Sequence, residues 1–136
     1  GVDPKDTFGM QMAPMANVVA DAATLENVIA HIGTLPDKAP MATVTGDVDH
    51  GRKLFQTCAL CHGENGAGTW ATNAPRIAGR SDWYLKRQLE YFKNGVRGKH
   101  PDDLYGAQMD MMVGALIGEH AIDDVVAYIN TLHAAN

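Results

Sequence analysis

Apolar residues recur at helical spacing through the second half of the chain, and no stretch alternates for long in the manner of a strand. The clearest segment is "SDWYLKRQLEYFKNG" (residues 81–95), in which Ser81 is a candidate N-cap and Gly95 a stop signal. Its apolar face holds Leu85, Leu89 and Phe92. The spacing predicts a helix between the two signals.

Two further segments have the same period. "GDVDHGRKLFQTCALCHG" opens with Asp47 as a candidate N-cap, and "EHAIDDVVAYINTLHAAN" (residues 119–136) follows near the end. The candidates for buried faces are Val48, Leu54 and Phe55 in the first, and Ile122, Val125, Val126, Ile129 and Leu132 in the second. We therefore expect an all-α fold.

The composition changes in the stretch "LPDKAPMATVTGD", which holds two prolines, a glycine and small polar residues. We read this stretch as a linker and expect a first part at residues 1–35, the linker at 36–46 and the main domain at 47–136. A chain of 136 residues suffices for one compact domain with a short appendage.

Charge and hydropathy exclude two classes of partner. The net charge is −5, whereas nucleic-acid binding needs clustered Lys and Arg. No apolar run approaches the ~20 residues that span a bilayer, so we expect no transmembrane segment.

The two cysteines lie together in "CALCH", which places Cys58, Cys61 and His62 at the C-x-x-C-H spacing of c-type haem attachment. Two thiols three residues apart on a helical turn can reach the two vinyl groups on one edge of a porphyrin. The adjacent imidazole then lies under the iron.

Three other readings of this segment fit less well. A structural zinc site wants four Cys or His ligands, but the remaining histidines show no paired spacing. A thioredoxin-like CxxC follows a strand, yet the residues before Cys58 have a helical pattern. A disulfide would leave His62 without a role.

With these motifs, residues Gly46 to Leu132 resemble a class I c-type cytochrome, of the branch that includes small monohaem proteins and two-domain dihaem proteins. The segments that carry the resemblance are "GRKLFQTCALCHG", "APRIAG", "YLKRQLEYFKNGVRG", "YGAQM" and "IDDVVAYINTL". It implies three main helices around one covalently bound haem c, with an N-terminal helical extension.

The resemblance also implies roles for single residues. Gly51 and Phe55 on the first helix would meet Tyr128 on the last, and the carbonyl of Pro75 would accept the proton of the far nitrogen of His62. The candidates to contact the porphyrin, its rim or its propionates are Ile77, Trp70, Arg76, Arg80, Trp83, Tyr84 and Arg97.

The same resemblance implies a methionine as the second iron ligand, on the loop before the last helix. Met109 in "YGAQM" matches that position, so His62 and Met109 are the expected ligands. Met111 and Met112 are better explained as core residues, because methionine fills irregular gaps. His/Met ligation raises the reduction potential.

Residues 9–35 align without a gap on residues 106–132 at an offset of 97, with nine identical positions. The first part therefore looks like the tail of a preceding cytochrome domain whose own CxxCH is absent, either because the chain is a fragment or because a remnant serves packing. Met12 would then have no iron in this chain. The apolar face of residues 24–35 could cover the second domain or pair two copies as a homodimer through residues 9–35.

We expect a one-electron carrier between respiratory redox partners, with no catalytic residues and a periplasmic location, because haem attachment in this family takes place outside the cytoplasm. The partners would be a donor and an acceptor, such as a membrane respiratory complex or a terminal oxidase or reductase, met at the haem edge near Ala59 and Leu60. The alternatives are a gas- or peroxide-binding sensor and an electron-entry domain of a larger oxidoreductase.

Overall fold

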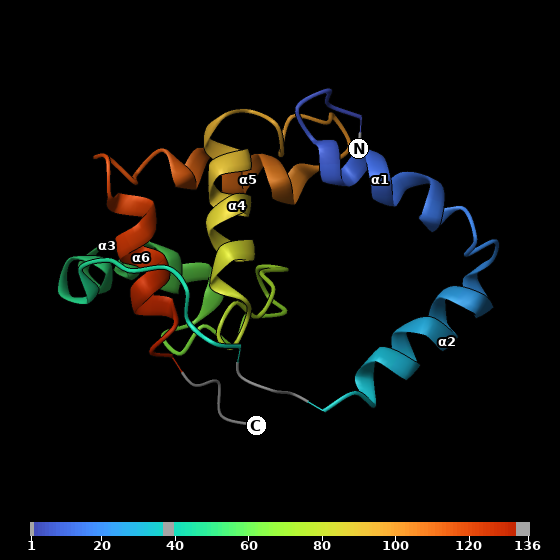
Figure 1. Cartoon of the computed structure of the whole chain (residues 1–136), viewed down its shortest axis with the longest axis horizontal. Coiled ribbons are helices and arrows are strands. Elements are labelled where there is room, and N and C mark those ends of the chain that lie inside the picture. Colours follow the sequence, from blue (N-terminus) through green and yellow to red (C-terminus); the bar gives the residue numbers. More distant parts are fainter. Residues whose placement is uncertain (1, 37–39, 133–136) are drawn as a thin grey trace. The chain divides into compact units, whose positions relative to one another are not determined.

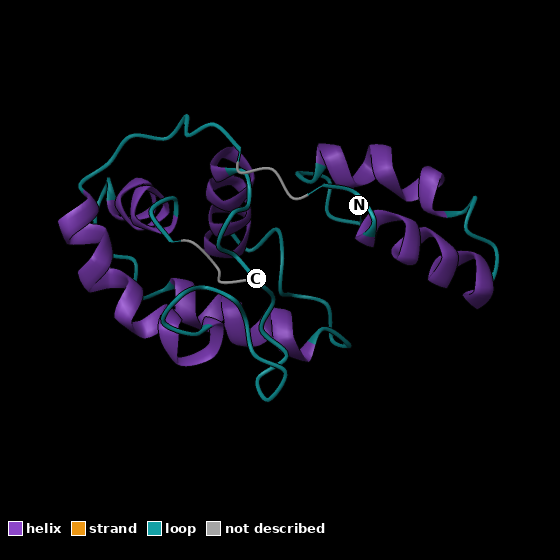
Figure 2. Ribbon diagram, turned by 90° about the horizontal axis from the view of Figure 1, so that it is seen from below, coloured by secondary structure: helices purple, strands orange, loops and turns teal. Residues whose placement is uncertain are grey.

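The computed structural model describes residues 2–36 and 40–132, and the chain divides into two compact units, Gly1–Lys38 and Ala39–Asn136 (Figure 1). Over these described residues it has helices joined by loops and no named strand (Figure 2), which confirms the all-α class. The second unit begins inside the 36–46 segment. None of the described helices is long and apolar enough to cross a membrane.

The second unit is built on α3 (Val48–His62), α4 (Asp82–Lys93), α5 (Leu104–Val113) and α6 (Ala121–Ile129). Helix α6 packs against both α3 and α4, and α4 also packs against α5. The buried apolar core is Phe55, Leu85, Phe92, Val113, Leu116, Ala121, Val125, Val126 and Ile129. Partly buried against it are the other expected residues Leu54, Leu89, Ile122 and Leu132. The expected apolar faces are confirmed in this sense except at Val48, which is 41% exposed on the first turn of α3.

The starts of α3 and α4 and the end of α4 lie largely where the sequence predicts them. The Asp47 carboxylate accepts hydrogen bonds from the backbone N–H groups of Asp49 and His50 at 2.9 and 3.0 Å, which makes it the N-cap of α3. Ser81 occupies the N-cap position of α4 without a side-chain cap bond. Gly95 follows the end of α4 with a φ of +68°, a conformation open to glycine. Residues 133–136 of the last expected helix lie outside the described residues.

Helices α3 and α6 cross at very close range. A Cβ at Gly51 would overlap the backbone of Asp124, so only glycine permits this approach. One turn further along α3, the ring of Phe55 lies 5.2 Å from that of Tyr128, tilted by 55°. This geometry fixes the last turns of α3, which carry the "CALCH" segment.

Met109 lies within helix α5 rather than on a loop, which corrects the expectation from sequence. The Asp103 carboxylate accepts a hydrogen bond from the N–H of Gly106 at 2.8 Å and so starts the helix. The segment "LYGAQMDMMV" contains no proline, and its leucine, alanine, glutamine and methionines are good helix formers. The pattern has no clear apolar face, because apolar residues lie all round this helix.

The first unit consists of α1 (Thr7–Ala16) and α2 (Ala22–Gly33), and neither helix has a buried residue. Adding the offset of 97 to the bounds of α1 gives the bounds of α5. Helix α2 likewise falls over α6, differing by a few residues at its ends. The sequence repeat is therefore also a repeat of helices.

Hydrogen bonds that flank the helices repeat at the same offset. Asp6 accepts from Gly9 N–H at 2.9 Å, as Asp103 does from Gly106. Past the second helix of each pair, a threonine hydroxyl donates to the carbonyl three residues earlier at 2.7 Å, from Thr34 in one unit and Thr131 in the other. Such matched caps do not follow from similar composition alone.

Candidate haem-binding site

The last turn of α3 presents two thiols and an imidazole together. Cys58 and Cys61 are free and half-buried, and His62 is buried at 8% exposure. Residues three apart on a helix share a face, so both thiols lie on one side of α3. Burial raises the pKa of the Cys58 thiol, which keeps it protonated.

His62 is held by the backbone of the following loop. Its Nδ1 lies 2.9 Å from the carbonyl oxygen of Pro75. A carbonyl oxygen can only accept, so Nδ1 carries the proton and Nε2 retains its lone pair. Such a bond fixes both the tautomer and the orientation of a metal-binding histidine. The lone pair of Nε2 is thus available to bind an iron.

The loop after α3 is tied to the same turn by further bonds that the sequence did not predict. The hydroxyls of Thr69 and Thr72 each donate to the carbonyl of Cys61 at 3.0 Å, and Gly68 N–H donates to the carbonyl of His62 at 2.8 Å. These donors satisfy two of the carbonyl groups at the end of α3 that have no hydrogen-bond partner within the helix. No sequence motif predicts that loop threonines will donate hydrogen bonds to the end of a helix.

Of the expected haem contacts, Ile77 and Met109 pack against the core cluster, as Cys58 also does. Met109 is half-buried on α5, whereas Met111 is 70% exposed and Met112 38%. Three segments that are distant in sequence thus bring apolar side chains and a thioether to one core.

The other candidates lie further out. Arg80 is exposed, and Trp83 and Tyr84 are 50% and 44% exposed at the start of α4. The guanidinium carbon of Arg87 lies over the indole of Trp83, 5.0 Å from the centroid of that ring. The other two arginines have partners of their own: Arg76 Nε donates to Ala78 O, and Arg97 donates to Gln88 and lies over Phe92. Trp70 is 97% exposed.

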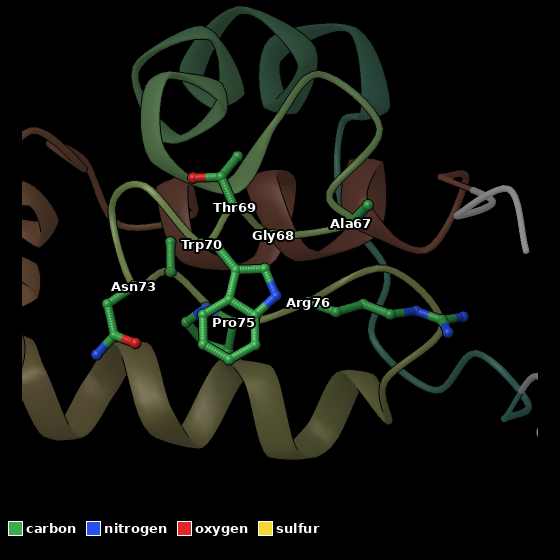
Figure 3. A pocket seen from close by; sticks show the side chains of 8 residues that line it. Ala67, Gly68, Thr69, Trp70, Asn73, Pro75 and Arg76 are labelled. Carbon is green, nitrogen blue, oxygen red and sulfur yellow. The ribbon is translucent and has the colours of Figure 1, made fainter. Parts of the chain in front are cut away.

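Two open hollows flank the "CALCH" turn. One, of about 500 Å³, is lined by Arg52, Phe55, Gln56, Ala59, Leu60, Glu64 and Tyr128. It adjoins the edge at Ala59 and Leu60 expected from the sequence. The other, of about 320 Å³, lies within the loop after α3 and is lined by Ala67, Gly68, Thr69, Trp70, Asn73, Ala74, Pro75 and Arg76 (Figure 3).

The donor set fits a covalent haem better than the other readings. Zinc has no site among the described residues, because nowhere do three His, Cys, Asp or Glu side chains gather around a metal position. The thiols form no disulfide, and they lie near the end of helix α3 rather than after a strand. Two free thiols on one face of α3 and an oriented imidazole are groups that would hold a haem c.

Comparisons with known proteins agree with this geometry. The family model described as Cytochrome c matches residues 48–133. Cytochrome c4 of Stutzerimonas stutzeri is 31% identical over 93 residues, which cover 67% of this chain and 43% of the relative. The thiosulfate dehydrogenase electron acceptor of Thiomonas intermedia (strain K12) is 33% identical, covering 64% of this chain and 34% of that protein.

A third relative, the thiosulfate dehydrogenase electron acceptor of Stutzerimonas stutzeri (strain A1501), is 33% identical over 70% of this chain and 48% of its own length. The chain therefore spans less than half the length of these relatives. The family and its c4 members support covalent haem c and electron transfer through it. By its sequence, its helices and its thiol and imidazole geometry, the chain belongs to the cytochrome c family.

Proposed function

We propose that the chain is a one-electron carrier, with one haem c joined to Cys58 and Cys61 and with His62 and Met109 as iron ligands. When bound, the haem supplies an iron that gains or loses one electron. The observation that carries the proposal is the bond between His62 Nδ1 and Pro75 O, which leaves Nε2 available. The chain's own task is to hold both ligands still, so that transfer needs little rearrangement.

Met109 is the second ligand in this proposal because of its place in the fold. It packs against the same core as Cys58 and is half-buried. A soft sulfur ligand in an apolar surrounding stabilises ferrous iron over ferric iron. Met111 is too exposed to offer such a surrounding.

The test is the visible spectrum of the ferric protein with Met109→Ala. The parent should show the weak far-red band of sulfur-to-iron charge transfer, and the variant should lose it. Met111→Ala serves as the matched control and should keep the band. Persistence of the band in Met109→Ala would assign the iron to another methionine, and absence of haem bands in the parent would overturn the carrier function.

We further propose a donor. Two relatives have names that describe acceptance of electrons from thiosulfate dehydrogenase. By this likeness the chain takes one electron from such a dehydrogenase and passes it to a later carrier or oxidase. The proposed location is the periplasm, which suits both this electron transfer and the chemistry of haem attachment.

The first unit is proposed to be the C-terminal part of a preceding cytochrome domain. Its two helices and its caps match α5, α6 and their caps at one offset, as described above. The face that α6 buries at Val125, Val126 and Ile129 recurs in α2 as Val28, Ile29 and Ile32, which are 41–59% exposed. A face of this kind normally packs against the equivalent of α3.

The relatives are about twice as long as the matched region, which agrees with a paired-domain origin. Dimerisation through residues 9–35 stays a prediction as the other way to cover the face. Sedimentation of the chain and of Ile29→Lys over a range of concentrations tests whether two copies pair through this face. A dimer that Ile29→Lys dissociates supports pairing of copies, and a monomer in both cases argues against it.

A further inference from the structure

Helix α5, which carries the proposed iron ligand Met109, is held from outside by the segment that joins it to α4. Met109 packs against the apolar core, to which Val113, one turn later on the same helix, belongs. Another side of α5, at Gly106 and Asp110, faces the connecting segment. Residues four apart are neighbours on the surface of a helix. The position of α5 therefore depends on the connecting segment as well as on the core.

The first contact with this segment is a close approach of backbones at Gly98, which is buried and has a φ of +80°. A Cβ at this position would overlap the carbonyl group of Gly106 and would lie 3.1 Å from the Cβ of Asp110. Glycine permits both the left-handed conformation and the short spacing. The connecting segment is therefore seated directly against two successive turns of α5.

The second contact is an ion pair formed by the next residue. Lys99 Nζ donates to Asp110 Oδ2 at 2.6 Å. The side chain of Asp110 is only 20% exposed, whereas that of Lys99 is 58% exposed, so the carboxylate has lost much of its water and depends on its partner. The stem of Lys99 lies close to Gly95, where a Cβ would be 3.3 Å from Cε, and this packing limits the freedom of the lysine.

The chain beyond α5 is attached to α4 separately. Lys93 Nζ, at the end of α4, donates to the carbonyl oxygen of Leu116 at 2.6 Å, and Leu116 is buried in the core. Two lysines thus connect α4 and the segment after it to α5 and to the chain that follows α5. Of these two bonds, the one from Lys99 ends on the residue next to Met109.

We propose that Lys99 and Asp110, together with the contact between Gly98 and Gly106, are positioning residues that hold the Met109 thioether on the haem iron. This inference rests on the proposed ligation by Met109. A ligand on a rigid helix leaves the iron only when the helix moves, and breaking the ion pair adds to the cost of that movement. Loss of the pair increases the fraction of molecules with an open ligand position, and a competing ligand then binds more tightly in the same proportion.

The experiment titrates the full haem-bearing chain, in the ferric state, with free imidazole, which displaces the thioether and removes the far-red band. Lys99→Met should raise the apparent affinity for imidazole about two- to fivefold, as expected for the loss of one partly exposed ion pair. Lys99→Arg keeps the charge and should stay close to the parent. Lys86→Met is the matched control, because it removes a 2.5 Å ion pair to Asp123 that joins α4 to α6 rather than to α5. It should leave the imidazole affinity unchanged even where it lowers the midpoint of urea unfolding.

Gly98→Ala tests the backbone contact, with a larger expected effect. The new methyl group collides with Gly106 and should raise the imidazole affinity about tenfold. Gly118→Ala is its control, because Gly118 also has a positive φ, of +112°, but a Cβ there meets nothing within 4 Å. This control has the backbone strain without the collision and should match the parent. Equal effects of the two glycine variants would assign the change to strain and overturn the role of Gly98.

A cycle with Met109→Ala separates positioning from simple access of imidazole to the haem. No thioether competes in that background, so Lys99→Met should no longer change the imidazole affinity. An effect of Lys99→Met that is absent from the parent background, persists in Met109→Ala, or is reproduced by Lys86→Met overturns the positioning role and leaves the ligation intact. A parent without the far-red band, or a Met109→Ala variant that keeps it, overturns the ligation by Met109 and the positioning role with it.

Discussion

His62 Nδ1 and the carbonyl oxygen of Pro75 are joined by a hydrogen bond of 2.9 Å, between the end of α3 and a loop residue thirteen positions later. The bond places partial negative charge against the far side of the imidazole. An imidazole that donates such a bond is a stronger ligand through Nε2, and a stronger ligand favours ferric iron. The proline ring restricts the backbone at this position and so holds the carbonyl in place.

Pro75→Gly should therefore raise the reduction potential of the haem, by tens of millivolts, because the freed carbonyl bonds His62 less well. Spectroelectrochemical titration measures the potential directly. Pro101→Gly, at an exposed turn, is the matched control and should leave it unchanged. Equal potentials in the parent and in Pro75→Gly would show that the carbonyl does not tune the ligand.

Gly51→Ala should destabilise the second unit by about 1–3 kcal/mol, because the new methyl group overlaps the backbone of Asp124 and must force α3 and α6 apart. Thermal unfolding followed at the haem band measures this loss. The matched control is Gly33→Ala in α2, where a Cβ meets nothing within 4 Å. There the substitution should be neutral or slightly stabilising for its helix. An unchanged midpoint for Gly51→Ala would mean that the crossing yields without cost.

Much of this fold could be predicted from the sequence because period and caps act locally. The faces of α4 and α6 follow from apolar residues three and four apart, and Asp47 caps α3 as its position suggests. Helix α5 could not be found in the same way. The sequence predicts Met109 on a loop, and the apolar residues of this segment have no preferred side from which to recognise a helix.

The candidate site likewise has a part that could be predicted from local sequence and a part that could not. The thiols and the imidazole follow from spacing within one helical turn, and the role of Pro75 follows from likeness to a family. The bonds of Thr69 and Thr72 to Cys61, and the exposure of Trp70, depend on how a loop folds back over eight to eleven residues. No periodic pattern encodes such contacts.

Asp82 shows most clearly what tertiary contacts add. In sequence it is an ordinary acidic residue in the first turn of α4, but it is 1% exposed. Its carboxylate accepts hydrogen bonds from the backbone of Thr43, Val44 and Trp83, from the Thr43 hydroxyl and from the Asn130 amide. It thereby joins the start of the second unit to α4 and to the end of α6.

Burial acts to raise the pKa of Asp82, but the hydrogen bonds from Val44, Thr43 and Trp83 outweigh it and hold the pKa well below its ordinary value of 3.8. Because the folded pKa is depressed, the ionised carboxylate stabilises the fold at every pH above the unfolded value. That stability is lost as the pH falls through about 4 and toward the lower folded pKa. Between pH 5 and 8 this residue should cause no change.

Asp82→Asn should cost about 2–4 kcal/mol at pH 7, because an amide accepts fewer of these bonds and brings two donors of its own. The loss relative to the parent should shrink below pH 4, because the unfolded parent then takes up a proton at this carboxylate while the folded parent, with its depressed pKa, does not. Urea unfolding of both proteins at pH 7, 5, 4 and 3 measures the difference. Asp102→Asn, on an exposed turn, is the matched control and should follow the parent throughout. A difference between Asp82→Asn and the parent that stays constant down to pH 3 would mean that packing at this position, rather than the charge, stabilises the fold.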